Sequence, residues 1–258
     1  MRTVRITRYV TPLREGGSLP AIVEANDDGM YVVKFRGAGQ GVRALIAELV
    51  AGELARAAGL LVPEIVLAEL HGDLARTEPD PEIFVLIRDS AGLNLALDYL
   101  PGSVMFDPVA DRPAVDLAAR IVWFDACVTN VDRTARNPNM LMWHRRLWVI
   151  DHGASLYFHH TAGWESGRGN ARDPFPMIKE HVLWASACRL LTEVDEQMAA
   201  ALTEDRIAAI VDLIPEGWLI DDDGGADEAS RRRAAYRRYL IDRLAAPRTF
   251  VEEAIGAR

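Results

Sequence analysis

A hairpin-like stretch in the middle of the chain, "NVDRTARNPNMLMWHRRLWVIDHG" at residues 130–153, most strongly constrains the fold. Its two apolar runs, "NMLMW" and "RLWVID", predict two short antiparallel strands joined by a tight turn. Polar residues stand at the open end: Asp132 and Asn137 precede the first strand, and Asp151 ends the second. A hairpin brings these positions together, so the pattern indicates either turn-capping residues or a site.

Both interpretations have a physical basis. If the turn centres near Arg145, Asn139 lies across from Asp151, and Asn137 lies about two residues beyond. An amide oxygen beside a carboxylate offers the hard oxygen ligands that suit Mg²⁺, with phosphate oxygens completing its shell. Asp132 is then placed to accept a hydroxyl proton. In the alternative, these residues only cap turns and end a strand, because Asp and Asn are common turn residues.

The spacing of the polar residues favours the site. An Asp, four residues, an Asn and then a strand-borne Asp is the arrangement of protein-kinase catalytic loops. Here it reads "DRTARN" followed by "IDHG", with "DHG" in the place of "DFG". The spacing predicts Asp132 as the catalytic residue and Asn137 and Asp151 as Mg²⁺ ligands.

The remaining parts of this arrangement occur upstream in the correct order. Gly16, Gly17 and Ser18 form a turn between two predicted strands, where backbone N–H groups can approach ATP phosphates. Lys34 follows on the third predicted strand. Lys and Arg total 29, yet only Lys34 and Lys179 are lysines, so Lys34 is not a generic surface charge. The alternatives are a plain hairpin turn and a lysine that extends from an edge strand to solvent.

Two glutamates compete as the partner of Lys34. Alignment of the motifs favours Glu48 in "IAELV". Helical phasing instead favours Glu53, which falls nearer the centre of an apolar face formed by Leu45, Ile46, Leu49, Val50, Ala57 and Leu60. We favour Glu48 and keep Glu53 as the alternative.

The segments "YVVKF", "ELVAGELARAAGLLVPE", "NVDRTARNPN" and "VIDHG" resemble the HipA-like kinases, relatives of the protein kinases and phosphoinositide kinases. The resemblance covers roughly residues 15–155. It implies a bilobal kinase fold, ATP, Mg²⁺ and phosphorylation of a Ser or Thr on a protein. Within it, Arg133 holds the catalytic loop, and Asn139 supports the metal or is an alternative ligand. The chain starts almost at the kinase lobe, so we expect no additional N-terminal subdomain like that of full-length HipA toxins, which puts a toxin role in doubt.

The pattern of elements predicts an α+β fold with two lobes. Alternating stretches in residues 1–36 predict strands, and "VRALIAELVAGELARAAGL" predicts a helix. "EIVLAEL" and "EIFVLIR" are predicted as further strands of an antiparallel sheet, and "SAGLNLALDYLPGSVMFDP" as a loop-rich connection. "PAVDLAARIVWFDACV" predicts a helix with Pro at its start, and the C-terminal part is predicted to be mainly helical. We expect an N-lobe at 1–88, a linker at 89–100 and a C-lobe at 101–258.

Composition limits the classes of partner and compartment. A net charge of -9 argues against nucleic-acid and anionic-membrane partners. No apolar run is long enough to cross a bilayer, and two cysteines in apolar contexts indicate a cytoplasmic protein. The expected partners are ATP and a protein substrate. Three other classes remain: a nucleotide-binding pseudokinase, a kinase for a small-molecule or lipid hydroxyl, and a helical interaction protein.

Overall fold

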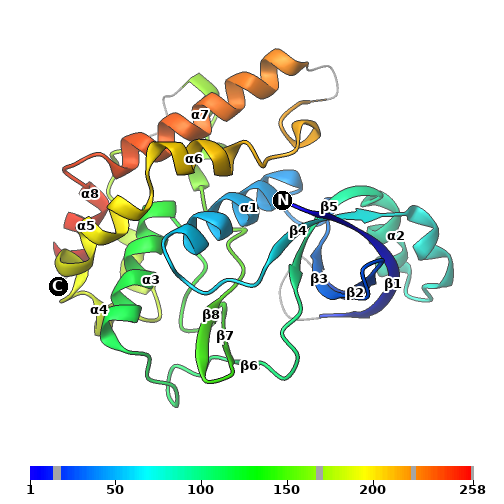
Figure 1. The fold of residues 1–258 in the computed structure, drawn as a ribbon, viewed down its shortest axis with the longest axis horizontal. Coiled ribbons are helices and arrows are strands. Elements are labelled where there is room, and N and C mark those ends of the chain that lie inside the picture. Colours follow the sequence, from blue (N-terminus) through cyan, green and yellow to red (C-terminus); the bar gives the residue numbers. More distant parts are fainter. Residues whose placement is uncertain (14–18, 167–170, 222–224, 257–258) are drawn as a thin grey trace. The chain divides into compact units, whose positions relative to one another are not determined.

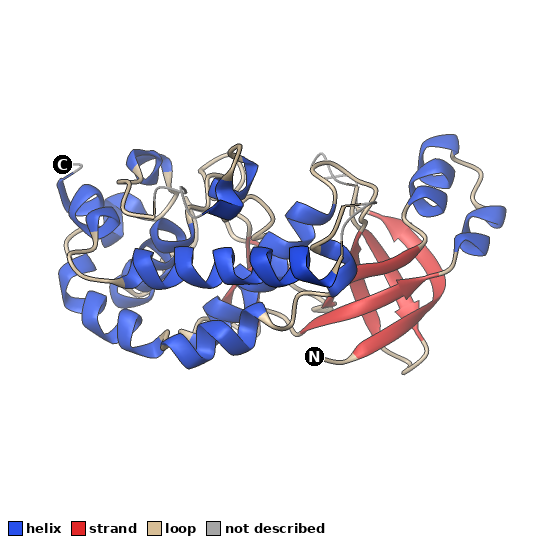
Figure 2. Cartoon of the chain, turned by 90° about the horizontal axis from the view of Figure 1, so that it is seen from above, coloured by secondary structure: helices blue, strands red, loops and turns tan. Residues whose placement is uncertain are grey.

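The chain forms two compact units in the computed structural model, which describes residues 1–13, 19–166, 171–221 and 225–256 (Figure 1). The first unit comprises Met1–Leu49 and Pro63–Gly102, and the second comprises Val50–Val62 and Ser103–Arg258. The long strands belong to the first unit and most of the helices to the second (Figure 2). The fold therefore mixes α and β structure, as the sequence predicts.

The first unit is built on a closed five-stranded barrel of order β1-β2-β3-β5-β4. The strands are β1 (Thr3–Pro12), β2 (Ala21–Ala25), β3 (Met30–Lys34), β4 (Ile65–Leu70) and β5 (Gly92–Asp98). All neighbouring pairs are antiparallel except β1 and β4, which run parallel from Thr3 opposite Leu67. The expected purely antiparallel sheet is therefore wrong in this pair.

Irregularities in β1 explain the closure. Its register with β2 shifts between Ile6 and Arg8 and again between Tyr9 and Thr11. Such irregularities bend and twist a strand. The ten-residue β1 can therefore pair with β2 from Ile6 to Pro12 and with β4 from Thr3 to Arg5.

The predicted strand "EIFVLIR" is wrong: these residues lie in helix α2 (Pro81–Asp89). Asp80 is the N-cap, and its Oδ1 accepts a hydrogen bond of 3.0 Å from the backbone N–H of Glu82. Pro81 occupies the first turn, where a missing N–H costs nothing. Ile83 and Ile87, four residues apart, are buried in the barrel core.

The predicted loop-rich connection is also wrong in part. Residues 92–98 form β5, which pairs with both β3 and β4. Four consecutive residues of β5 are buried. The buried Asn94 is satisfied locally: its Nδ2 donates to Ser90 O at 2.9 Å, and its Oδ1 accepts from Arg36 N at 2.8 Å.

Helix α1 (Val42–Ala57) confirms the predicted helix, and the second unit centres on helix α3 (Val115–Val128), which also confirms a prediction. In α3, Trp123 packs edge-on against Phe250 with ring centroids 5.4 Å apart. The other helices are α4 (Trp184–Ala187), α5 (Leu191–Ala201), α6 (Glu204–Val211), α7 (Ala226–Leu244) and α8 (Thr249–Gly256). No helix within the described ranges has both the length and the apolar character to cross a membrane.

The predicted hairpin is present in the second unit. Strand β7 (Met140–Trp143) pairs with β8 (Arg146–Val149), and the two-residue β6 (Val104–Met105) extends the sheet beside β7. The two turn residues, His144 and Arg145, have φ values of 46° and 60°. Two positive φ values define the type I′ turn, whose twist matches that of the flanking strands.

Candidate active site

A buried ionic network holds the loop that follows α3. Arg133 Nε donates to Asp125 Oδ2 at 2.6 Å, and both side chains are completely buried. His181 Nε2 lies 2.9 Å from the same oxygen, and Asn130 Nδ2 donates to Asp125 Oδ1 at 3.1 Å. A carboxylate removed from water requires such partners, because an unpaired buried charge is strongly destabilising.

The protonation states follow from these contacts. Burial favours a raised pKa for Asp125, but the charge of Arg133 and the hydrogen bond from His181 hold this pKa below its usual range. Burial also lowers the pKa of His181, despite the opposing effect of Asp125. The backbone N–H of Leu183 donates to His181 Nδ1 at 3.0 Å. His181 is therefore neutral at pH 7, with its proton on Nε2, because Nδ1 must accept.

Arg133 also connects the loop to the hairpin. Its Nη1 donates to the carbonyl oxygen of Ile150 at 3.1 Å and to that of Asn139. One guanidinium thus joins the end of α3 to the open end of β7–β8. The prediction that Arg133 holds the loop by charge-assisted hydrogen bonds is confirmed.

Asp132, the next residue toward the N-terminus, presents its carboxylate to two predicted site residues. Its Oδ2 accepts from Asn137 Nδ2 at 2.8 Å and from Asn139 Nδ2 at 3.2 Å. Its Oδ1 accepts no hydrogen bond from the part of the chain that the structure describes. The carboxylate is therefore oriented by two amides and retains one oxygen for a further donor.

The hairpin register differs by one residue from the prediction. Met140 pairs with Val149, and the N–H of Ile150 donates to Asn139 O at 3.0 Å. Asn139 thus lies across from Ile150, rather than from Asp151. The reason is the two-residue turn, which centres between His144 and Arg145 instead of on Arg145.

Asp151 follows β8 in an unusual backbone conformation. Its φ is 56°, and the φ of Asn139 is 49°. Non-glycine residues in this left-handed region are uncommon and cluster at functional sites. The next residue, His152, is fully buried, and its ring packs edge-on against Phe124 with centroids 6.2 Å apart. The histidine of "DHG" therefore has an apolar packing environment.

Lys34 and Glu48 form an ion pair in the first unit. Lys34 Nζ lies 2.5 Å from Glu48 Oε2, and the two side chains are 13% and 0% exposed. The competing Glu53 is 22% exposed and pairs with Arg56, with Nε and Oε2 3.7 Å apart. The geometry therefore agrees with the motif alignment. Whether the Lys34–Glu48 pair binds nucleotide stays a prediction.

The predicted phosphate-binding turn of Gly16, Gly17 and Ser18 lies outside the described residues. Among the residues that are described, no three His, Cys, Asp or Glu side chains gather as a metal site. A site made of one amide oxygen and one carboxylate does not require such a cluster. Asn137 fits this role, since its Nδ2 is held by Asp132 and its Oδ1 accepts no bond from the described part of the chain.

Sequence reasoning missed Asp125 and His181. Asp125 carried a usable signal, because a lone carboxylate in the apolar helix segment "IVWFDACV" must find a cation or strong donors. His181 carried none, since it lies 56 positions from Asp125 in a different segment. Arg243 was also missed: its buried side chain donates to Cys127 O and Ala126 O at 2.8 Å and fixes the last turn of α3.

The model of the HipA-like kinase family matches residues 6–246 of the chain. The chain belongs to the HipA-like kinase family. A comparison with curated protein sequences gave no significant match. This HipA-like kinase is also similar in fold to two solved structures, although both are distant in sequence.

One is the Helicobacter pylori proinflammatory kinase CtkA, with 12% identity and a TM-score of 0.59 over 99% of this chain and 98% of that one. The other is the Golgi casein kinase with Mn/ADP bound, with 10% identity and a TM-score of 0.51 over 99% of this chain and 75% of that one. Both neighbours are kinases, and together with family membership they support a kinase-type phosphotransferase.

Proposed function

We propose that the chain transfers the γ-phosphate of ATP, with Mg²⁺, to a Ser or Thr hydroxyl of a protein. The observation that carries the proposal is the geometry of Asp132. Its Oδ2 is held by the amides of Asn137 and Asn139, and its Oδ1 is left for a further donor. A carboxylate fixed in this way is suited to orient an acceptor hydroxyl and to take up its proton.

Asn137 and Asp151 are the proposed ligands of Mg²⁺, with Asn139 as an alternative. The hydrogen bond from Asn137 Nδ2 to Asp132 turns the amide oxygen of Asn137 away from that carboxylate. A divalent ion there would neutralise negative charge on the phosphates. The Mn/ADP in the Golgi casein kinase structure supports the use of a nucleotide and a divalent metal.

Lys34 is proposed to hold phosphate oxygens, with Glu48 orienting its ammonium group. The short contact and complete burial of Glu48 support this role, since the pair restricts where Lys34 Nζ can lie. Gly16, Gly17 and Ser18 are proposed to cover the phosphates. The predicted division into an N-lobe at 1–88, a linker at 89–100 and a C-lobe at 101–258 stays a proposal, although β5 (Gly92–Asp98) of the predicted linker pairs within the barrel.

Two properties distinguish this proposal from its alternatives: the rate of phosphate transfer and the class of hydroxyl that accepts the phosphate. A pseudokinase would bind nucleotide without transferring phosphate, and the set of Asp132, Asn137 and Asp151 counts against it. A small-molecule or lipid hydroxyl is the other acceptor class. The absence of nucleic-acid and membrane partners stays a prediction from net charge.

The test is phosphate transfer from labelled ATP by wild type and Asp132→Asn, with Mg-ATP binding measured in parallel. The asparagine retains the shape and an oxygen that can accept from Asn137 and Asn139, but it cannot take up a proton. We expect near wild-type Mg-ATP affinity and transfer reduced by about 10²–10⁴-fold. Autophosphorylation or a generic protein acceptor provides the signal.

Two results would contradict the assignment. Equal transfer by wild type and Asp132→Asn, with nucleotide binding intact in both, would favour a pseudokinase. Loss of Mg-ATP binding in the variant would mean that Asp132 contacts the metal or maintains the loop, rather than the acceptor.

A further inference from the structure

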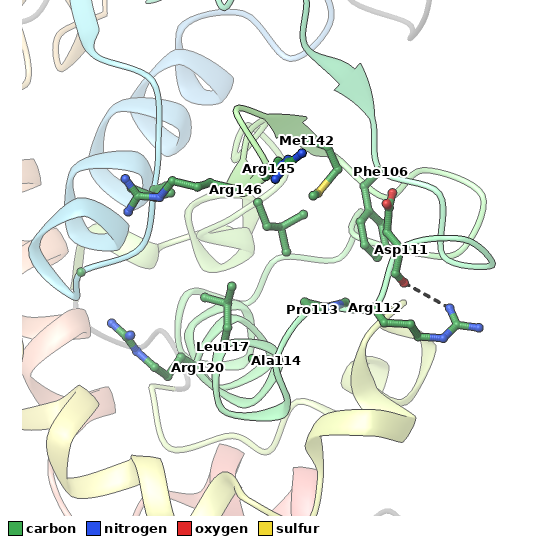
Figure 3. A pocket seen from close by; sticks show the side chains of 13 residues that line it. Phe106, Asp111, Arg112, Pro113, Ala114, Leu117, Arg120, Met142, Arg145 and Arg146 are labelled. Atoms are coloured by element: carbon green, nitrogen blue, oxygen red, sulfur yellow. Dashed lines mark hydrogen bonds between the residues drawn. The ribbon is translucent and has the colours of Figure 1, made fainter.

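We propose that the second unit holds another ligand site, a pocket that binds a small organic anion bearing a phosphate or carboxylate group. The pocket has a volume of about 420 Å³ and lies entirely within the second unit (Figure 3). Its walls come from the segment after α1, the start of α3, the segment before α3 and the turn of the β7–β8 hairpin. This volume is within the usual range of small-molecule sites, about 300–1,000 Å³.

The pocket is strongly cationic in a chain of net charge -9. Arg112, Arg120, Arg145 and Arg146 line it, with Asp111 as the only acidic lining residue. About one residue in ten of this chain is an arginine, so the 13 lining residues would contain one or two by chance. Arginine is the side chain best suited to bind planar carboxylates and phosphates through paired N–H donors.

The charges of these arginines are not neutralised within the described part of the chain. Arg145 and Arg146 make no ion pair there. Arg120 donates to the carbonyl oxygen of Ala58 at 2.8 Å, and its Nε is buried without a hydrogen-bond partner. Arg112 donates to two backbone carbonyls, one of them Pro108 O at 2.7 Å. A carbonyl satisfies a donor but leaves the positive charge in place.

The start of α3 adds further donors. Pro113, Ala114 and Leu117 line the pocket, and α3 begins at Val115. The N-cap residue is Ala114, so no side chain caps the free N–H groups of the first turn. Free N–H groups at a helix N-terminus favour an anion. The uncapped terminus and the arginines therefore indicate the same kind of ligand.

The rest of the pocket lining is apolar, which indicates that the ligand has an apolar body beside its anionic group. Its large apolar members are Leu61, Phe106, Leu117, Met142 and Leu147. Phe106 and Leu147 are 3% and 6% exposed, so they form a packed wall. An inorganic ion would leave this wall in contact with water. The lining thus favours an organic anion with an apolar body over phosphate alone.

The pocket is separate from the candidate active site. Arg145 and Arg146 lie at the turn of the hairpin, whereas Asn139 and Asp151 lie at its open end. Strands of four residues separate these ends by roughly 13 Å. A ligand at the turn would contact the same hairpin that carries the proposed metal ligands.

The test is a calorimetric titration of phenyl phosphate, which joins one phosphate to one apolar ring, into the intact chain. We expect saturable binding by wild type, and weaker binding of inorganic phosphate. Arg146→Gln and Arg120→Gln should each weaken phenyl phosphate by about tenfold or more, the usual effect of losing a charged hydrogen bond. The matched controls are Arg189→Gln and Arg231→Gln, which change exposed arginines outside the pocket and should retain wild-type affinity.

Two further measurements separate ligand binding from folding and from the nucleotide site. Arg145→Gly removes one cation from a position with φ of 60°, where glycine is favoured. This variant should therefore fold at least as well as wild type but bind phenyl phosphate more weakly. Saturating Mg-ATP should leave phenyl phosphate binding in place. Absence of saturable binding, equal losses in the control variants, or full displacement by Mg-ATP would each overturn the proposal.

Discussion

Two neighbouring residues of the candidate site, Asp132 and Arg133, have different roles. The side chain of Asp132 is held through one carboxylate oxygen. Its backbone N–H donates to Asn130 Oδ1 at 3.1 Å, and its carbonyl oxygen accepts from Thr134 N–H at 3.0 Å. Arg133, its neighbour, is buried and bonds to Asp125 and to two carbonyl groups at the hairpin end. Asp132, the residue proposed for chemistry, is therefore partly accessible, whereas the neighbouring Arg133 holds the loop in place.

This division predicts the effect of removing Arg133. Arg133→Ala leaves Asp125 buried without its main cation, so the free energy of unfolding should fall by about 3–5 kcal/mol. Arg136→Ala, an exposed arginine of the same loop, should change it by less than about 0.5 kcal/mol. Urea denaturation of both variants and wild type gives the measurement. Equal stability of the two variants would show that the network does not stabilise the fold.

At the level of elements, prediction succeeded where sequence pattern and local chemistry agreed. The hairpin, α1 and α3 were predicted because periodicity and turn residues indicated the same structure. "EIFVLIR" was not, because its β-branched and aromatic residues favour a strand, whereas the capping Asp80 and Pro81 start a helix. β5 was missed because Gly92 and Asn94 are typical of loops. Its burial on both sides comes from pairing with β3 and β4, which no local pattern encodes.

The burial of helix α1 explains why helical periodicity did not identify the glutamate that pairs with Lys34. Its residues 45–51 are all buried, so the helix has no single apolar face on which Glu53 could be central. Glu48 can be buried because it meets Lys34. Motif spacing therefore predicted the partner better than helix periodicity.

A matched pair of substitutions on α1 tests the role of this contact. Glu48→Gln removes the charge that holds Lys34, so phosphate transfer should fall by about tenfold or more, as expected from losing a charged hydrogen bond. Glu53→Gln should leave transfer within about twofold, because Glu53 is partly exposed and pairs with Arg56. Transfer rates should be compared after circular dichroism confirms that both variants fold. A larger loss in Glu53→Gln would reverse the assignment.

For the whole molecule, the buried network links stability to pH. His181 has a lowered pKa in the folded chain because it is buried, and Asp125 has a lowered pKa because Arg133 and His181 outweigh its burial. Below about pH 6.5 the unfolded chain protonates this histidine while the folded chain does not. Below about pH 3.9 the unfolded chain also protonates Asp125, whereas the folded chain keeps it ionised. Both groups therefore favour unfolding as the pH falls, in two successive ranges.

The expected outcome is a free energy of unfolding that falls between pH 7 and pH 5. His181 can contribute a slope of up to about 1.4 kcal/mol per pH unit, the limit for one proton. His181→Gln retains a donor for Asp125 but does not titrate, so its stability should depend less on pH over this range. Urea denaturation at several pH values measures both slopes, and the other five histidines contribute equally to the two proteins. Identical slopes would mean that His181 takes up its proton in the folded chain, which would require Leu183 N–H to lose its acceptor on the ring.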